Sequence, residues 1–124
     1  RRGRLPFMSY TTTQLATAVL RRLGVLDATE TAASTDVTYI TDVWAAKWEE
    51  ISAHGQEITY FSYDDIPDAV FLTIRDLVAN EVRNEYGSPI SAQEKEQEET
   101  IILRRLRRHV AQQASGLPGK ALYF

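Results

Sequence analysis

The chain of 124 residues contains no cysteine. This absence excludes a disulfide framework, a thiolate metal site and a cysteine nucleophile, and it is compatible with a reducing compartment. Long apolar segments are also missing, because no run approaches the roughly 20 residues that a membrane helix needs. The first residues lack the apolar segment of a signal peptide. We therefore expect a soluble protein that is not exported and has no membrane partner.

The chain has no excess of positive charge either. Fourteen Lys and Arg residues stand against seventeen Asp and Glu residues, which gives a net charge of -3. This is the wrong sign for a protein that grips duplex DNA across its whole surface. Length and composition are those of one globular domain. We expect a helical domain over residues 10–115, a flexible N-terminal arm over residues 1–9 and an extended C-terminal tail over residues 116–124.

Apolar residues recur with the 3.6-residue period of amphipathic helices in four segments, residues 12–23, 35–54, 66–86 and 91–115. Thr11 and Gln14 have the spacing of a capping box before the first helix, and Gly24 and Gly87 follow the first and third helices as glycines do at helix ends. The predicted fold is mainly α, a four-helix bundle-like single domain. We expect its core to contain Leu20, Ile40, Trp44, Phe71, Ile74, Val78, Leu103 and Leu106.

Two features interrupt this helical pattern. Residues 58–63 are β-branched and aromatic, which favours one short extended or β segment that pairs in a small hairpin, pairs with a neighbouring subunit or lies over the helices. Asp64 or Asp65 is expected to cap the third helix, with Pro67 in its first turn.

Motifs for catalysis and cofactor binding are scarce. His54 and His109 have no Asp or Glu at ligand spacing on their own helix faces, and no phosphate loop, dinucleotide motif or nucleophile elbow occurs. The acidic pairs at residues 49–50, 64–65 and 98–99 would supply a glycosidase only if folding set the carboxylates at the required separation. We expect no catalytic residue, no metal and no cofactor.

The last helix sorts its charge along its length. Glu94 and Glu98 lie early, and Arg104, Arg107 and Arg108 lie late. The basic end could meet an acidic partner, phosphates or the acids of a neighbouring copy, or remain solvated. Beyond it, the tail ends in large apolar side chains that need burial in their own domain or in a partner.

The order of these elements resembles that of the head-to-tail adaptor (connector) proteins of tailed bacteriophages, with the closest likeness to the tail accessory factor of podoviruses. The resemblance runs from about Tyr10 to Ala114 and is strongest in the first helix. The features that carry it are Thr12–Val25 with its Leu23-Gly24-Val25 exit, the long second helix with Trp44 and Trp48 that ends at Gly55, the extended aromatic segment, Ile66-Pro67 before the third helix, and Tyr86-Gly87 after it. The chain is shorter at its C-terminus than the podovirus proteins and closer in length to siphovirus adaptors.

The resemblance implies a structural protein of the virion, located at the head-tail junction and assembled in the host cytoplasm. Such subunits form a homo-oligomeric ring, typically twelve-fold, under the portal protein, extend the DNA channel without binding a specific sequence, and provide the docking surface for tail or nozzle proteins. The resemblance places Leu117, Lys120, Leu122, Tyr123 and Phe124 in a portal-binding tail. A ring requires two different patches on each subunit, which predicts Glu94, Glu98, Arg104, Arg107 and Arg108 as interface residues.

We expect the free subunit to be monomeric or weakly associating and to form its ring on the portal. Two alternatives remain open. A phage-associated cell-wall hydrolase would use the acidic pairs, and a small DNA-binding regulator would show a steeply salt-dependent affinity for DNA.

Overall fold

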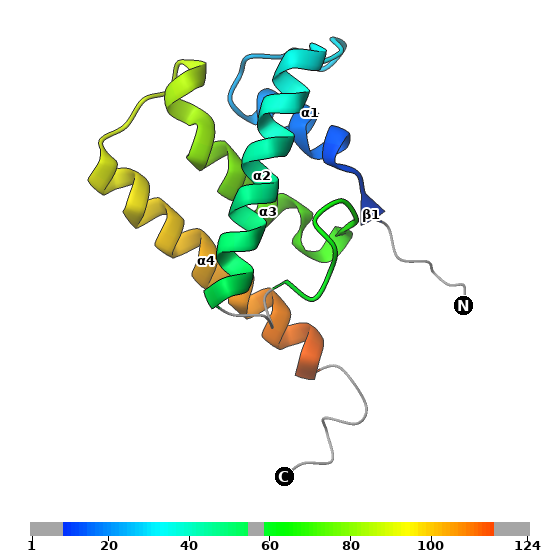
Figure 1. Ribbon diagram of the computed structural model, residues 1–124. Coiled ribbons are helices and arrows are strands. Elements are labelled where there is room, and N and C mark those ends of the chain that lie inside the picture. The colour runs from blue at the N-terminus through cyan, green and yellow to red at the C-terminus, as the bar shows by residue number, and fades with distance from the viewer. Residues whose placement is uncertain (1–8, 55–58, 116–124) are drawn as a thin grey trace.

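The computed structural model describes residues 9–54 and 59–115, and the side chains up to residue 111. In these ranges the chain forms a mainly α single domain with four α-helices, as predicted, and a two-stranded antiparallel sheet, which was not predicted (Figure 1). The elements are β1 (Ser9–Tyr10), α1 (Thr12–Arg22), α2 (Ser34–His54), β2 (Ile66–Pro67), α3 (Asp68–Val82), a 3-10 turn η1 (Arg83–Tyr86) and α4 (Ala92–Ser115).

Helix α3 is the centre of the domain, because α1, α2 and α4 all pack against it. Its side chains are buried on most of its circumference, including Val70, Ile74 and Val78, which are 0% exposed. Helices α2 and α4 lie on different sides of α3 (Figure 1). Helix α3 therefore lies beneath the space between α2 and α4. Polar side chains of the three helices contact one another there.

The predicted signals at both ends of α1 are confirmed. Thr11 accepts a hydrogen bond from the Gln14 backbone N–H at 3.2 Å, and the Gln14 side chain accepts one from the Thr11 N–H at 2.8 Å. At the other end Gly24 has a positive φ of 78°, which a glycine adopts without steric cost. The Val25 N–H then reaches the Leu20 carbonyl at 3.0 Å, so the helix ends in a Schellman motif.

The third helix begins two residues after its predicted start, and its predicted cap is wrong. Ile66 and Pro67 pair with Tyr10 and Ser9 as β2, and α3 begins at Asp68. Pro67 has an extended backbone with φ -64° and ψ 146°, and no side chain caps the helix, so Asp64 and Asp65 are not its caps. The strand pairing places the Ile66 side chain in the core, where it is completely buried. This burial favours the strand over a further helical turn.

The described part of the predicted extended segment, residues 59–63, forms no strand and lies against α2. The Trp44 indole N–H donates to the Tyr63 carbonyl at 2.6 Å, and the Trp48 indole N–H donates to the Phe61 carbonyl at 3.2 Å. Phe61 itself is buried at 9% exposure. Of the three arrangements open to this segment, the third is confirmed, because the two indoles satisfy backbone groups that a neighbouring strand would otherwise bind.

The predicted core is confirmed at seven of its eight positions. Leu20, Ile40, Trp44, Phe71, Ile74, Val78 and Leu106 are buried. Leu103 is only half-buried. The difference arises because Leu103 lies on the side of α4 that faces α2, where it lines an open hollow with Ile51, Glu99 and Arg107 instead of packing under another helix.

Candidate functional site

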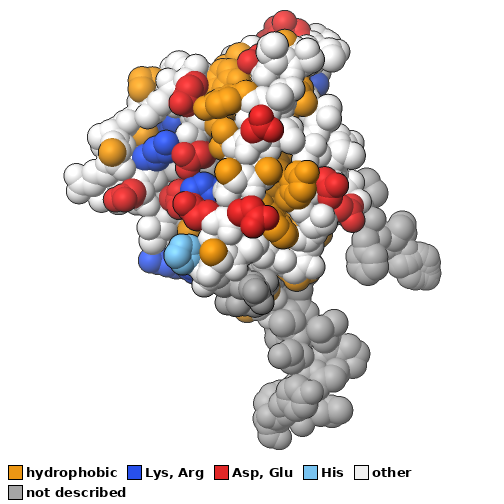
Figure 2. All heavy atoms as spheres, in the orientation of Figure 1, with side chains coloured by type: hydrophobic (Ala, Val, Ile, Leu, Met, Phe, Trp, Pro, Cys, Tyr) orange, Lys and Arg blue, Asp and Glu red, His pale blue; other side chains and the backbone are white. Residues whose placement is uncertain are grey.

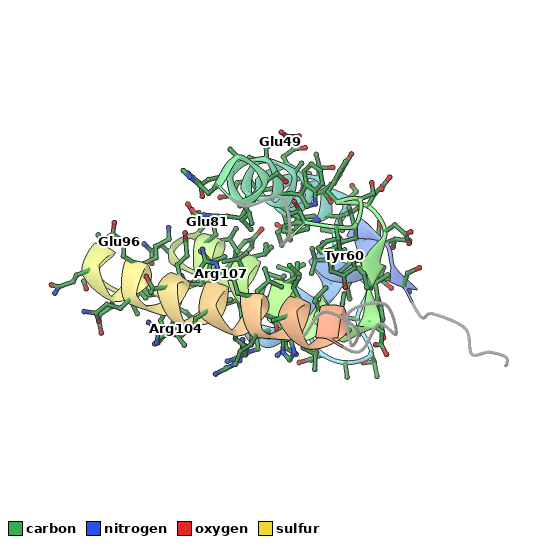
Figure 3. All side chains as sticks on the ribbon, turned by 90° about the horizontal axis from the view of Figure 1, so that it is seen from below. Glu49, Tyr60, Glu81, Glu96, Arg104 and Arg107 are labelled. Atoms are coloured by element: carbon green, nitrogen blue, oxygen red, sulfur yellow. The ribbon has the colours of Figure 1, made fainter. Side chains whose placement is uncertain are left out.

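The five predicted interface residues of α4 are exposed, but they do not share one face. Glu98 lines a hollow between α1, α3 and α4, whereas Arg107 lines the hollow between α4 and α2. Figure 3 shows Arg107 on the side of α4 toward α2 and Arg104 on the other side. Glu94 takes part in the start of its own helix, where its carboxylate accepts hydrogen bonds from the Ser91 N–H at 3.2 Å and the Ser91 hydroxyl at 3.0 Å. The predicted tail residues Leu117, Lys120, Leu122, Tyr123 and Phe124 lie outside the described residues.

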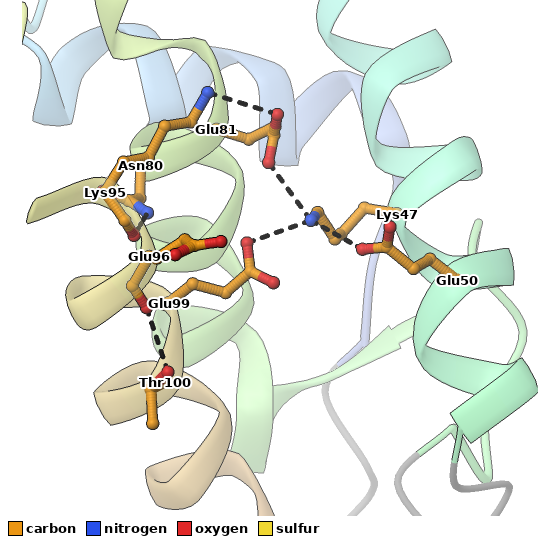
Figure 4. A network of polar contacts seen from close by, with 8 residues as sticks. All are labelled: Lys47, Glu50, Asn80, Glu81, Lys95, Glu96, Glu99 and Thr100. Atoms are coloured by element: carbon orange, nitrogen blue, oxygen red, sulfur yellow. Dashed lines mark hydrogen bonds and ion pairs between the residues drawn. The ribbon is translucent and has the colours of Figure 1, made fainter. Parts of the chain in front are cut away.

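A lysine that the sequence analysis did not single out links three helices. The side chain of Lys47 in α2 is 9% exposed, and its ammonium contacts Glu50 at 2.8 Å, Glu81 of α3 at 3.1 Å and Glu99 of α4 at 3.1 Å (Figure 4). Glu81 also pairs with Lys95 at 3.4 Å. This cluster is the polar connection across the surface between α2 and α4.

The electrostatics of the cluster favour its charged form. Burial alone would lower the pKa of Lys47, but the hydrogen bonds that it donates to Glu50, Glu99 and Glu81 outweigh burial and raise the pKa above its ordinary value. The same hydrogen bond to Lys47 and its positive charge lower the pKa of Glu50. At neutral pH the lysine is therefore positive and the three glutamates hold it, so this cluster stabilises the packing of α2.

A second cluster lies on the far side of α3, where three arginines surround one aspartate. Asp76 accepts contacts from Arg105 of α4 at 2.8 Å, from its neighbour Arg75 at 2.9 Å and from Arg22 of α1 at 3.5 Å. Burial raises the pKa of Asp76, but the hydrogen bonds from Arg75 and Arg105 lower it, so that it lies below its ordinary value. One carboxylate balances only one of the three guanidinium groups, and this side of the molecule is left with net positive charge.

Two of these arginines, Arg22 and Arg105, line a hollow of about 280 Å³ together with Arg83, and we call it the arginine hollow. Its wall contains Arg22, Asp76, Arg83, Glu98, Ile101 and Arg105. Two buried polar atoms in the wall residues, Asn80 Oδ1 and Arg105 Nε, have no hydrogen-bond partner. The Asn80 amide is fixed in orientation, because its nitrogen donates to the Lys95 carbonyl at 3.0 Å. Both unpartnered atoms are buried, so a molecule in the hollow would not contact them. The positive charge that is accessible in the hollow belongs to its arginines.

Two carboxylates from different acidic pairs, Glu50 and Glu99, border the same hollow between α2 and α4. Both form ion pairs with Lys47, whose ammonium contacts them at 2.8 Å and 3.1 Å. Asp64 accepts a hydrogen bond from the Ser62 hydroxyl at 2.7 Å within its own loop. Within residues 9–54 and 59–115, no three His, Asp or Glu side chains are grouped so that they could hold a metal ion.

The face shown in Figure 2 carries many acidic side chains along α2 and beside it. The exposed acids of α2 are Asp42, Glu49 and Glu50. Of these, Asp42 and Glu49 make no ion pair with any described residue. The molecule therefore has an acidic side at α2 and a basic side around the arginine hollow.

Comparison with known proteins yields no relative. No protein-family model, no curated protein and no solved structure matches the chain. None of the helices in the described ranges is both long enough and apolar enough to span a membrane.

Proposed function

We propose that this protein is a structural subunit of a virion, a head-to-tail adaptor that forms a ring with copies of itself beneath a phage portal. The observation that carries the proposal is the exposed and unpaired charge of α4. In this role the protein binds other proteins, extends the DNA channel, offers a docking surface to tail or nozzle proteins, and catalyses no reaction.

The charges of α4 change sign along its length. Glu94, Glu96 and Glu98 lie in its first half and Arg104, Arg107 and Arg108 in its second, all exposed, and none forms an ion pair with a described side chain. Glu94 and Arg108 are fourteen residues apart, a rise of about 21 Å along the helix. Opposite charges at this separation support binding to another copy in a fixed direction, which a closed ring requires.

Surface ion pairs are individually weak, at about 0–1 kcal/mol each. A ring repeats the same contact at every subunit, and attachment to a portal raises the effective concentration of neighbouring copies. We therefore propose that the ring forms on the portal template and that the free subunit associates weakly. The net charge of -3 suits a channel wall that DNA passes without binding.

The portal contact is proposed for the C-terminal tail. Its glycines and Pro118 prevent a continuing helix, and Leu122, Tyr123 and Phe124 form an apolar anchor of the kind that dominates interface energies. Leu117 and Lys120 belong to the same segment. Many weak anchors around a ring are sufficient together.

The test is to mix the purified protein with the portal of a phage that carries this chain and to image the product by electron microscopy. The full chain should add a ring to the portal. Deletion of residues 117–124 should leave helix content and thermal stability nearly unchanged and abolish attachment, whereas deletion of residues 1–7 should preserve both. If the subunit without residues 117–124 is unstable but still attaches to the portal, the tail packs on its own domain and the portal contact lies elsewhere.

Two other results would contradict the proposed function as a whole. Robust hydrolysis of cell-wall polymer by the purified protein, abolished by single Glu or Asp substitutions, would identify an enzyme. An affinity for DNA that falls steeply with salt would identify a DNA-binding protein.

A further inference from the structure

The acidic partner of the basic end of α4 is not evident from α4 itself. Glu94 is bound to Ser91 at the start of the helix, and Glu98 lines the arginine hollow beside Arg22 and Arg105. Both carboxylates are exposed and form no ion pair with a described residue, but each already lies beside a polar group of its own subunit. An acidic surface elsewhere on the molecule is a better match.

The outer face of α2 is such a surface. Residues three or four apart lie next to each other along one face of a helix, and the positions opposite the buried Ile40, Trp44 and Ile51 are all exposed. These positions are Tyr39, Asp42, Ala46, Glu49 and Ala53, which we call the α2 stripe. Its only charges are the two unpaired carboxylates, about 10 Å apart along the helix. The small side chain of Ala46 between them allows another helix to approach closely.

The basic counterpart lies on the outer side of α4. Ile101, Arg104 and Arg108 form one exposed row, which we call the α4 stripe. Ile101 is 54% exposed although it is a large apolar residue, and it also borders the arginine hollow. The two arginines form no ion pair with a described residue. An apolar side chain next to two free arginines suits a surface where a small residue lies next to two free carboxylates.

The two stripes lie on opposite sides of the subunit. Figure 3 shows Glu49 on the outer side of α2 and Arg104 on the side of α4 that points away from α2. Two complementary surfaces on opposite sides cannot bind each other within one chain. They join successive copies in one direction, which is the heterologous contact from which rings are built.

We propose that the α2 stripe of one copy docks on the α4 stripe of the next copy. This inference rests on the proposed function and names the surfaces of its ring contact. Asp42 and Glu49 of one subunit face Arg104 and Arg108 of its neighbour, and Ala46 lies near the neighbour's Ile101. In this arrangement Arg107, which lies on the α2 side of α4, stays outside the contact.

The absence of cysteine permits a test without background cross-linking. The double variant Ala46→Cys with Ile101→Cys, oxidised while bound to portal rings, should give a ladder of disulfide-linked multimers on non-reducing gels. Each single variant should lack the ladder, because a heterologous contact never brings two copies of one stripe together. The double variant Thr13→Cys with Ile101→Cys is the matched control, and it should also lack the ladder, since exposed Thr13 lies outside both stripes.

A charge exchange tests the same contact without cysteines. Asp42→Lys with Glu49→Lys, and separately Arg104→Glu with Arg108→Glu, should each lose ring formation on the portal. A mixture of the two variants should regain it, because each reversed stripe then meets the opposite reversed stripe. The double variant Asp27→Lys with Asp65→Lys, at two exposed residues outside both stripes, changes the net charge as much as the first pair and should assemble normally.

The outcomes separate this inference from the proposed function. Rings on the portal without a disulfide ladder, or rings that tolerate both charge reversals, would overturn the α2–α4 contact and leave the adaptor function standing. Absence of any portal-bound ring with the full wild-type chain would overturn the adaptor function and this contact with it. A ladder together with restored assembly in the mixture supports both.

Discussion

At the scale of single residues, Lys47 is a buried charge that connects three helices. It joins α2 to α3 and α4 through Glu81 and Glu99. Replacement of a buried lysine leaves its carboxylates without a counter-charge, and unpaired polar groups are costly. Because Glu81 and Glu99 are about one-third exposed, water replaces part of the lost interaction.

We predict that Lys47→Met lowers the free energy of unfolding by about 1–3 kcal/mol at neutral pH. Methionine keeps the length of the buried chain, so the loss reports mainly the ammonium. Urea denaturation followed by circular dichroism measures it. The matched control is Lys95→Met, which removes a half-buried ammonium that forms one ion pair among the described residues, with Glu81, and it should cost less. Equal losses in the two variants would show that Lys47 has no special role.

The cost of Lys47→Met should also depend on pH. The pKa of Glu50 is lowered in the folded protein, so its stabilising contribution is present above the ordinary value of 4.5 and is lost as the pH falls through the folded value. Lys47 has a raised pKa, so its contribution persists until the pH rises above its ordinary value of 10.5. The difference between wild type and variant should therefore be constant from about pH 6 to 9 and shrink below about pH 4. A difference that grows on acidification would contradict the assigned ion pairs.

The burial of Lys47 could have been predicted from the sequence, but a search for apolar residues alone does not find it. Ile40, Trp44 and Ile51 define the buried stripe of α2, and Lys47 lies at the missing position of that stripe. A charged residue on an apolar stripe predicts a buried ion pair. Its partners Glu81 and Glu99 could not be predicted, because the packing of α2 and α4 on α3 determines which distant carboxylates come within reach. The same is true of Asp76, whose arginines come from three helices.

At the scale of elements, the helices were predictable where local signals agree with the apolar period. The start and end of α1 each have a predicted motif that the structure confirms. The start of α4 was predicted only from its range, and the structure shows Ser91 as its cap. The β-strands were not predictable, because each consists of two residues and has no alternating pattern. The arrangement of the aromatic segment after α2 stayed open among three alternatives for a related reason. Its residues resemble those of a strand, yet they are selected for packing and hydrogen bonding against Trp44 and Trp48.

Phe71 tests how firmly the small sheet is held to α3. Its ring is 8% exposed and stacks on Tyr10 of β1 with a centroid separation of 3.9 Å. We predict that Phe71→Ala lowers the free energy of unfolding by about 3–5 kcal/mol, because it removes a large buried side chain and the aromatic contact together. Urea denaturation measures the loss, and Leu72→Ala, on an exposed neighbour at 59%, should change stability little. A loss below about 1 kcal/mol for Phe71 would mean that β1 is not part of the core.

At the scale of the whole molecule, charge is divided between two sides of a domain built around α3. Acids gather on α2, and arginines gather around Asp76 and along the second half of α4. The most exposed of these charges do not stabilise the fold through ion pairs. Four residues make no ion pair with a described residue, namely Asp42, Glu49, Arg104 and Arg108. Charges that are exposed, unpaired and separated by sign are suited to directing association.

The basic end of α4 supplies the last prediction. Arg104, Arg107 and Arg108 are exposed, so their simultaneous reversal to Glu should leave the subunit folded, with helix content and melting temperature close to those of the wild type. Ring formation on the portal should be impaired, because the reversed charges repel the acidic surface of the next copy.

Ionic attraction between exposed groups is screened over about 8 Å at physiological salt. Wild-type assembly should therefore strengthen at low salt and weaken at high salt, whereas the residual assembly of the triple variant should show the opposite trend. Electron microscopy and sedimentation at several salt concentrations measure both, with Arg107→Glu alone as the control that should assemble if the α4 stripe carries the contact. Survival of full assembly by the triple variant at physiological salt would show that the basic end of α4 is not an interface.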